Sequence, residues 1–393
     1  MLFLRFLWNS YTRAFALWLL HWFYPVKRGR VMLVSWAGSK YNCNPRAIAE
    51  AIIGNDDISQ RFELNYAFTH PESFTEVPIT IHKVEIGSLE YYQLLATSKF
   101  IITNIRLAGQ MFPFKKRGQY YIHTTHGGHG LKKVEKDAAD VLPEAYIRQM
   151  KLEAGMIDLM LSDSRIRTKQ LHESYLYPGE ILEKGLPRNK VFFQSENKLT
   201  ELRKKVCDSL ALPDNAHLLL YAPTFRNNGR RDVYGFDVNR VLAACNRRWG
   251  GEWFLLISSH PNMLSFYREI YDFSHPKVRD IGGYDLQNFL VVGEALITDY
   301  SSSGLDFSLI PRPVFLLAYD LTDYDRGFYF DIRKLPYPLS QTEEELIHNI
   351  ESFNERDYRQ SLKRFQNEVI GLNETGHASE AVVQWMLKHI DNP

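Results

Sequence analysis

The chain has few cysteines, almost no net charge and no internal repeat or low-complexity tract. Its three cysteines, Cys43, Cys207 and Cys245, are far apart and form no CxxC pair. Isolated cysteines argue against a disulfide framework or a structural zinc site, and they suit a reducing cytosol. A net charge of +1 over 393 residues gives no broad positive field, so we expect no nucleic-acid partner.

The composition is that of an ordinary globular protein, with 45% hydrophobic and 24% charged residues. A chain of 393 residues is too long for one compact core. Two domains are therefore the first expectation.

The N-terminal segment Met1–Tyr24 is dense in leucine, phenylalanine and tryptophan, but Arg5 and Arg13 interrupt it. A spanning helix needs about 20 nearly uninterrupted apolar residues, and a signal peptide ends in a small-residue cleavage site that is missing here. Aromatic residues favour the membrane–water boundary, and the basic stretch 27–30 favours anionic lipid. We predict an amphipathic helix over residues 1–28, lying on the cytoplasmic face of the membrane as a peripheral anchor. The alternative is a helix packed on the protein's own core.

Short apolar strands alternate with helices along most of the chain, which favours parallel sheets covered on both faces. In the first half we expect strands at Val31–Trp36, Glu63–Phe68, Thr80–Val84, Phe100–Thr103, Tyr120–His123 and Leu159–Ser162, and helices at Pro45–Ile53, Asp137–Lys151 and Ile166–Glu173. In the second half we expect strands at Leu218–Tyr221, Trp253–Ser258, Val278–Ile281, Ala295–Thr298 and Val314–Leu317, and helices at Asp237–Asn246, Tyr284–Val291 and Gly304–Leu309.

The pattern predicts an α/β protein that resembles the GT-B arrangement, in which two Rossmann-like doubly wound domains face each other across a cleft. The polar segment Glu196–Lys205 is interpreted as the crossing between them. We expect residues 29–195 to form the N-terminal domain and residues 196–340 the C-terminal domain. Residues 341–393 would be helices that pack back on the domains.

The segment Glu294–Phe330 contains the strongest candidate for a ligand site. Asp299 and Tyr300 stand at the end of a predicted strand, and Ser301–Ser303 begins a predicted helix. Free backbone N–H groups at a helix start attract anions, and ligands of open α/β sheets bind at the carboxyl ends of strands. The alternative is that these serines only cap the helix.

A second candidate is the run from His123 to Lys133, HTTHGGHGLKK, which also follows a predicted strand. Gly127, Gly128 and Gly130 allow the backbone to approach a ligand closely, and His126 can transfer protons near neutral pH. We favour catalysis over a plain loop. A metal site is a third reading, but no carboxylate or cysteine completes a ligand set at familiar spacing.

Two further motifs follow predicted strands. In Ser259–His260–Pro261 the histidine stands alone before a proline, where a structural role is more common than a catalytic one, and its place at a strand end is what raises the functional reading. In Tyr221–Arg226, YAPTFR, the guanidinium of Arg226 could meet a phosphate, because its planar set of donors matches phosphate oxygens. The alternative is a surface arginine.

The ordered set of motifs between residues 120 and 335 resembles the CDP-glycerol glycerophosphotransferase family, which includes teichoic acid primases, polymerases and related capsule transferases. The motifs are HG at His126–Gly127 followed by LKK, Gly185–Asn189, YAPTFR, HP at His260–Pro261, LITDYSS at Leu296–Ser302 and AYDLTDYDRGFYFD at Ala318–Asp331.

The resemblance implies transfer of glycerol phosphate, or another alditol phosphate, from a CDP-alditol to a hydroxyl of a lipid-linked acceptor, with release of CMP. It implies His126 as general base and His260 as a cation that steadies phosphate charge. It implies no metal and no cofactor beyond the substrate. The residues that would bind substrate are Gly127, Lys132, Arg188, Thr224, Arg226, Asp299, Ser301, Ser302 and Asp306.

The chain departs from the family pattern at three places. Thr125 stands where tryptophan is usual, Gly128–His129 where Thr-Pro is usual, and Ser258 where arginine is usual. These departures suggest a divergent branch with a different acceptor or alditol. A GT-B glycosyltransferase using a nucleotide sugar and an inactive membrane-bound scaffold are the rival readings. The sequence leaves the alditol, the number of units added and the oligomeric state open.

Overall fold

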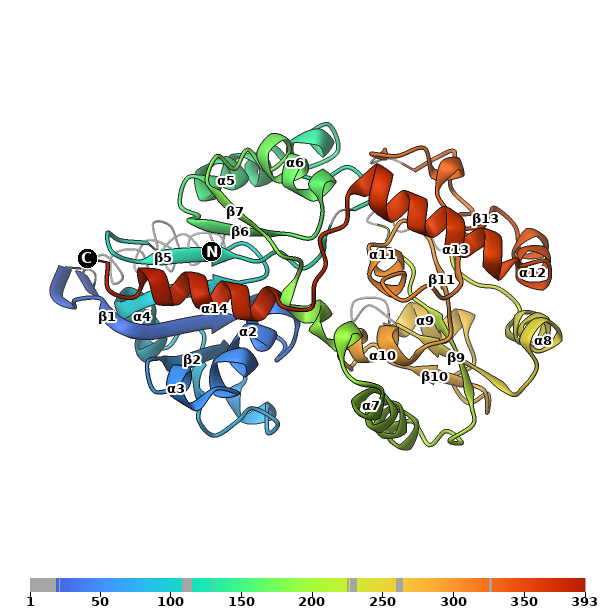
Figure 1. The fold of residues 1–393 in the computed structure, drawn as a ribbon, viewed down its shortest axis with the longest axis horizontal. Coiled ribbons are helices and arrows are strands. Elements are labelled where there is room, and N and C mark those ends of the chain that lie inside the picture. The colour runs from blue at the N-terminus through green and yellow to red at the C-terminus, as the bar shows by residue number, and fades with distance from the viewer. Residues whose placement is uncertain are drawn as a thin grey trace, which may run out of the picture. The chain divides into compact units, whose positions relative to one another are not determined.

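The computed structural model describes residues 19–20, 22–107, 115–128, 130–224, 226, 232–258, 264–324 and 327–392. The chain divides into two compact units, whose elements are labelled in Figure 1. Unit 1 consists of Met1–Gly128, Glu135–Lys190 and Asn373–Pro393, and unit 2 consists of His129–Val134 and Val191–Leu372. The predicted C-terminal segment 341–393 is thus divided between the units.

Unit 1 is built on a seven-stranded sheet with the order β3-β2-β1-β4-β5-β6-β7. All its strand pairs are parallel. The strands are β1 (Lys27–Val34), β2 (Glu63–Phe68), β3 (His82–Glu85), β4 (Ser98–Thr103), β5 (Tyr120–His123), β6 (Leu159–Ser162) and β7 (Glu180–Glu183). The direction of winding reverses between β1 and β4, which makes this pair the switch point of the sheet.

Buried side chains cover both faces of this sheet. Val31 and Leu33 of β1 join one core cluster, together with residues of α2 (Cys43–Ile53) and α14 (Ala378–His389). Met32 and Val34 join the opposite cluster, with residues of α4 (Leu89–Thr97) and α6 (Arg165–Glu173). Since successive residues of a strand point to opposite faces, this uninterrupted apolar run produces the doubly wound arrangement.

Unit 1 differs from the sequence expectation in its helices. The predicted helix Asp137–Lys151 is wrong at its start: a 3-10 turn covers Glu135–Ala138, and α5 (Glu144–Ala154) begins only after Pro143. A residue before proline is pushed out of the helical region, and proline itself is tolerated only at a helix start. Helix α4 and strand β7 were not anticipated. A short helix, α3 (Asp56–Ser59), completes the unit.

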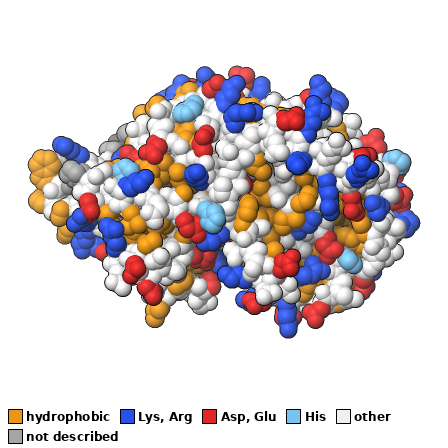
Figure 2. Space-filling view, viewed as in Figure 1, with side chains coloured by type: hydrophobic (Ala, Val, Ile, Leu, Met, Phe, Trp, Pro, Cys, Tyr) orange, Lys and Arg blue, Asp and Glu red, His pale blue; other side chains and the backbone are white. Residues whose placement is uncertain are grey.

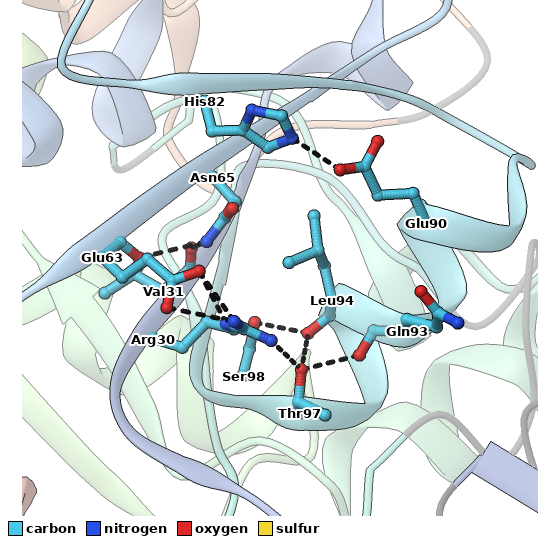
Figure 3. Close-up of polar contacts among 10 residues, drawn as sticks. All are labelled: Arg30, Val31, Glu63, Asn65, His82, Glu90, Gln93, Leu94, Thr97 and Ser98. Atoms are coloured by element: carbon cyan, nitrogen blue, oxygen red, sulfur yellow. Dashed lines mark hydrogen bonds and ion pairs between the residues drawn. The ribbon is translucent and has the colours of Figure 1, made fainter. Parts of the chain in front are cut away.

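Figure 3 shows the polar contacts that join the amino ends of β1 and β2 to α4. Arg30 donates from Nε and Nη2 to the carboxylate of Glu63, at 2.9 and 3.1 Å, and from Nη1 to Thr97 Oγ1 at 2.6 Å. Its side chain is only 11% exposed. Arg30 is therefore a structural residue of this edge, and only Lys27 and Arg28 of the basic stretch are left for the predicted attraction to lipid.

Unit 2 repeats the same strand order in a six-stranded sheet, β10-β9-β8-β11-β12-β13. Its strands are β8 (His217–Tyr221), β9 (Trp253–Ile257), β10 (Val278–Asp280), β11 (Ala295–Thr298), β12 (Val314–Leu317) and β13 (Leu339–Ser340). Its helices are α7 (Glu196–Ser209), α8 (Val238–Trp249), α9 (Leu264–Ile270), α10 (Leu286–Val292), α11 (Ser303–Phe307), α12 (Glu343–Glu351) and α13 (Glu355–Arg364). The segment Glu196–Lys205, expected at the crossing between the domains, belongs to α7, close after the point at which the chain passes from unit 1 to unit 2 between Lys190 and Val191.

The predicted membrane helix, residues 1–28, lies outside the described residues up to residue 18 and at residue 21. Of its described part, Trp22 and Phe23 are 77% and 71% exposed, and Arg28 forms an ion pair with Asp391. Within the described ranges, no helix combines the length and the apolar character needed to cross a membrane. Figure 2 shows acidic and basic side chains interspersed over the face in view, in keeping with the small net charge.

Candidate active site

Most of the predicted site residues that the structure describes lie just after the carboxyl ends of strands. In unit 1, Thr124–Gly128 follows β5, Asp163 follows β6 and Gly185–Arg188 follows β7. At the switch point, the backbone N–H of Trp36, after β1, donates to Asn104 Oδ1, after β4, at 2.9 Å. This edge is where open α/β sheets bind ligands.

The amide of Asn44 joins the two motif loops of unit 1. Its Nδ2 donates to the carbonyl oxygens of Thr124 and Thr125, at 3.3 and 2.8 Å, and its Oδ1 accepts from the backbone N–H of Arg188 at 3.0 Å. The guanidinium of Arg188 donates in turn to the carbonyl of His126. Asn44 is fully buried, so these bonds fix the HG loop against the Gly185–Arg188 loop.

Thr125 adopts a left-handed backbone with φ +55°, which is unfavourable for a β-branched residue. Its hydroxyl accepts from Arg167 Nη2 at 3.2 Å and donates to the carbonyl of Gly127 at 2.9 Å. Such conformations cost about 1–3 kcal/mol and persist only where the surroundings hold them. The threonine found in place of the usual tryptophan therefore has a definite role: its hydroxyl fastens the loop.

His126 is exposed, and its ring lies 4.9 Å from the indole of Trp36 between ring centroids. His123, the last residue of β5, is buried. Burial above all lowers the pKa of His123 well below its usual value, and the nearby charges of Arg106, His126 and Arg167 add to this. His123 is thus neutral, and of these two histidines only His126 is exposed to exchange protons with a substrate.

Glu374 supports the Gly185–Arg188 loop from the returning C-terminal segment. Its Oε1 accepts from Leu186 N at 3.0 Å and from Asn189 Nδ2 at 2.7 Å. Sequence reasoning missed Asn44, Arg167 and Glu374. Asn44 stands near a predicted helix start, but no local pattern marks any of the three as a partner of the motif loops.

In unit 2 the guanidinium of Arg226 is buried between two carboxylates. It contacts both oxygens of Asp320, from Nε at 2.7 Å and Nη2 at 3.0 Å, and Asp299 Oδ2 from Nη1 at 2.8 Å. Nη1 also donates to the Thr224 carbonyl at 2.7 Å, and the ring of Tyr300 lies 4.9 Å from the guanidinium carbon. These contacts occupy most of its donors, so the structure gives Arg226 an organising role at the strand ends and does not present it to a phosphate.

Asp299 completes this network. Its Oδ1 accepts from the backbone N–H groups of Thr224 and Tyr300, at 2.7 and 2.5 Å. Tyr300 donates its hydroxyl to Asp320 Oδ1 at 2.9 Å. Asp299 therefore ties the loop after β8 to the loop after β11, and Asp320, which sequence reasoning left out of the site, holds both.

The remaining predicted binding residues of unit 2 fall into two groups. Ser301 and Ser302 are half-buried before α11, and the Ser301 hydroxyl lies 2.9 Å from that of Ser303. Asp306 is buried inside α11 and accepts from Gln287 Nε2 at 3.1 Å. The serines are thus the more accessible of the predicted ligands here, whereas Asp306 faces α10.

Lys132 belongs to unit 2 and forms an isolated antiparallel bridge with Phe328. The neighbouring backbone pairs are Lys133 N to Gly327 O at 3.0 Å and Tyr329 N to Leu131 O at 2.8 Å. The LKK motif therefore lies beside the AYDLTDYDRGFYFD motif. His129 and His260 lie outside the described residues, and Ser258 donates its backbone N–H to the Tyr221 carbonyl at 2.9 Å.

Within the described ranges, no group of three or more His, Cys, Asp and Glu side chains is placed to hold a metal ion.

Two parallel sheets of Rossmann order, with motif residues at their carboxyl edges, define an α/β protein of the GT-B-like class. Residues 16–388 match the family described as CDP-glycerol:poly(glycerophosphate) glycerophosphotransferase. The chain belongs to this family, and the resemblance, the GT-B-like fold and the enzyme class expected from the sequence are confirmed.

Relatives and solved structures agree with the family. The chain is 28% identical to a teichoic acid poly(glycerol phosphate) polymerase of Bacillus spizizenii, over 92% of this chain and 93% of that protein. It is 27% identical to a teichoic acid glycerol-phosphate transferase of Staphylococcus aureus, over 90% and 92%. The solved wall teichoic acid polymerase TagF superposes with a TM-score of 0.78 at 26% identity, over 93% of this chain and 90% of that one. A TagF variant soaked with CDPG gives the same TM-score at 25% identity, over 93% and 89%.

The carboxylate of Asp320 should govern part of the acid stability of unit 2. Burial alone would raise its pKa, but hydrogen bonds and charge from Arg226 outweigh burial and hold the pKa below its usual value. A lowered pKa contributes stability that is complete above the unfolded pKa, near ~3.9, and is lost as pH falls through the folded pKa. Asp320→Asn should lower the free energy of unfolding by about 3–5 kcal/mol at neutral pH, and its unfolding midpoint should vary less with pH below about 4.

Thermal unfolding between neutral and acid pH measures both effects. Asp323→Asn, at an exposed position of the same motif, is the control and should follow the wild-type curve. A neutral-pH midpoint for Asp320→Asn equal to wild type would contradict the assigned role.

Proposed function

We propose that the chain transfers glycerol phosphate from CDP-glycerol to a hydroxyl of a lipid-linked saccharide or growing polymer, releasing CMP, in the synthesis of a teichoic acid or a capsule-type polymer. The observation that carries this proposal is the family match across residues 16–388. The relatives named above act on glycerol phosphate in teichoic acid synthesis, and the related TagF was studied with CDPG.

The proposed step forms one P–O bond and breaks another. The acceptor hydroxyl oxygen attacks the phosphorus that bears glycerol, in line with the bond to CMP, and the hydroxyl proton passes to a general base. Phosphoryl transfer of this kind depends on positioning and charge neutralisation more than on covalent catalysis. CMP leaves with the bonding electrons.

His126 is our candidate for the general base. It is exposed at the carboxyl edge of unit 1, and its carbonyl and the preceding residues are held by Arg188, Asn44 and Arg167. A general base must lie within hydrogen-bond distance of the reacting proton. A loop held by hydrogen bonds from three residues suits this role. The resemblance assigns His260 the complementary role of a cation beside the phosphates.

In unit 2, Ser301 and Ser302 are proposed to bind the pyrophosphate through hydroxyl and backbone N–H groups. We propose that the loop carrying these serines is held in place by Thr224, Arg226 and Asp299. We propose that Gly127, Lys132, Arg188 and Asp306 complete the substrate-binding set, with Asp306 acting through its helix because its side chain is buried. No metal or cofactor is assigned to the reaction.

A lipid-linked acceptor implies work at the cytoplasmic face of the membrane. The exposed Trp22 and Phe23 and the basic Lys27 and Arg28 support a peripheral attachment through the N-terminal segment, because aromatic and cationic side chains both favour an anionic bilayer surface.

The donor should be a CDP-alditol. Incubation with CDP-glycerol and a panel of lipid-linked acceptors should release CMP, and calorimetry should find CDP-glycerol or CMP bound more tightly than UDP-sugars. Release of UDP or GDP from a nucleotide sugar would instead identify a glycosyltransferase. An absence of turnover with CDP-glycerol and CDP-ribitol alike would indicate a scaffold.

His126→Ala and His260→Ala should each keep the fold and lose roughly 10²–10⁴-fold in turnover, the usual contribution of general acid–base catalysis. His82→Ala is a matched control. His82 is an exposed histidine of β3, and its Nε2 lies 2.8 Å from Oε1 of Glu90 in α4 (Figure 3). His129→Ala should have a smaller effect than His126→Ala. Near-normal CMP release by a folded His126→Ala protein would exclude this residue as the base.

Deleting residues 1–24 should move the protein from the membrane to the soluble fraction and leave CDP-glycerol binding intact. Burial of several aromatic and aliphatic side chains, at about 25 cal/mol per Å², is enough for reversible attachment. Lys27→Gln combined with Arg28→Gln in the full chain should weaken binding to phosphatidylglycerol vesicles, by about 1 kcal/mol for each charge, and should not change binding to phosphatidylcholine vesicles. A truncated protein that pellets with vesicles as well as the full chain does would refute the anchor.

A further inference from the structure

The carboxyl group of Asp163 lies directly against the backbone of Gly128. A Cβ atom built on Gly128 would lie 1.7 Å from Asp163 Oδ2, 2.6 Å from Cγ and 3.2 Å from Oδ1. Heavy atoms in ordinary contact are about 3.5–4.0 Å apart. Because the whole carboxyl group covers the Cβ position, turning it about its own axis would not make room.

Asp163 is fixed where it stands. It follows β6, its side chain is buried, and its Oδ1 accepts from the Ser164 hydroxyl at 2.9 Å. Its carbonyl accepts from the backbone N–H of Asn373 at 2.6 Å, on the segment that returns to unit 1. A larger residue at position 128 therefore meets a side chain held at both its carboxyl group and its backbone.

Gly130 provides the contrast. A Cβ atom on Gly130 would meet only the Lys132 carbonyl oxygen, at 3.6 Å, which is an ordinary contact. Neither Gly128 nor Gly130 has a positive φ, so alanine is compatible with the backbone at both. The two positions differ in the space around the Cβ atom: at Gly128 this space is filled by Asp163, and at Gly130 it is open.

Gly128 is also the last residue of unit 1 before the chain enters unit 2, and it stands two residues after His126. Upstream, Asn44 and Arg167 hold Thr125, and Arg188 holds the carbonyl of His126. On the downstream side of the histidine, the Gly127 carbonyl accepts from the Thr125 hydroxyl, and Asp163 packs against Gly128. The HG loop is therefore fixed on both sides of His126.

We propose that Asp163 and Gly128 form a steric lock that positions His126, and that Asp163 is a positioning residue for the proposed transfer. The pair also accounts for glycine at 128, where the family pattern has threonine: the carboxyl group of Asp163 occupies the place that a side chain at 128 would take. The inference rests on the proposed function for its catalytic readout, and on packing alone for its structural readout.

The first comparison is Gly128→Ala against Gly130→Ala. Gly128→Ala should lower kcat for CMP release on the order of 10–10²-fold, because a shift of about 1 Å in a catalytic group has effects of this size. The Kd for CDP-glycerol should stay near the wild-type value, since the lock lies outside the predicted donor contacts. Gly130→Ala adds a Cβ atom that meets only an ordinary contact, so it should leave Tm unchanged and should lower kcat far less than Gly128→Ala does.

The second comparison is a double-mutant cycle, which isolates the coupling between two residues in contact. Asp163→Ala removes the obstacle, so adding Gly128→Ala to it should cost less than threefold in kcat, far less than in the wild-type background. Asp163→Asn keeps the shape and should keep kcat within about threefold. Multiplicative losses in the double variant, or a wild-type kcat in Gly128→Ala, would overturn the lock.

Thermal unfolding repeats the cycle without any assay of turnover. Gly128→Ala should lower Tm by roughly 2–8 °C, as overpacking does, and this loss should disappear in the Asp163→Ala background. If the wild-type protein releases no CMP but the Tm cycle shows coupling, the proposed function fails and the packing of the lock stands. If CMP is released and neither cycle shows coupling, the lock fails alone.

Discussion

The buried guanidinium of Arg226 is the interaction on which the carboxyl edge of unit 2 depends. Three strand ends meet at it: Thr224 after β8, Asp299 after β11 and Asp320 after β12. Parallel strands leave their last carbonyl and N–H groups at one edge, where loops of different origin must be held together. A buried charge that lost one of its carboxylates would cost several kcal/mol, so the three loops are fixed as a set. Ser301 and Ser302 directly follow Asp299 and Tyr300, so this network also fixes the backbone position of the two half-buried serines.

In unit 1 a neutral group takes a central part in holding the loops, alongside the guanidinium groups of Arg167 and Arg188 and the carboxylate of Glu374. The amide of Asn44 both donates and accepts, and so connects the loop after β5 with the loop after β7 without a buried charge. A neutral amide has a lower desolvation cost than an ion pair. It also adds no charge of its own beside His126. The two units thus share a strand order and differ in how they fasten the edge that carries the motifs.

The sequence predicts the framework well because strand signals are local. Buried runs such as those of β2, β5, β6, β11 and β12 have the same bounds in the structure as in the prediction, since an apolar run between turn signals is read from neighbouring residues alone. The motif residues were found for the same reason: each stands directly after such a run. The partners of those residues could not be found this way. Asn44 lies 80 residues before Thr124, and Glu374 lies 188 residues after Leu186, so only the folded topology brings them together. Arg226 shows the converse. Its residue type and place suggest a phosphate ligand, but the carboxylates that bury it, Asp299 and Asp320, follow β11 and β12 and cannot be inferred from its own motif.

The departures from the family pattern lie in the loops, and the described ones are accommodated there. The hydroxyl of Thr125 is used by Arg167 and Gly127, and an aromatic ring next to His126 comes from Trp36, although the position before the histidine no longer carries one. Gly128 leaves room for Asp163. Each change thus has a partner elsewhere in unit 1, and Ser258 leaves the backbone bond from its N–H to Tyr221 intact. A loop that had lost its function and accumulated substitutions would not be expected to keep Thr125 in a left-handed conformation, because that conformation persists only where neighbouring residues hold it. The loop around His126 is therefore held by its neighbours on both sides, through the hydrogen bonds of Thr125 and Arg188 and the packing of Asp163 against Gly128.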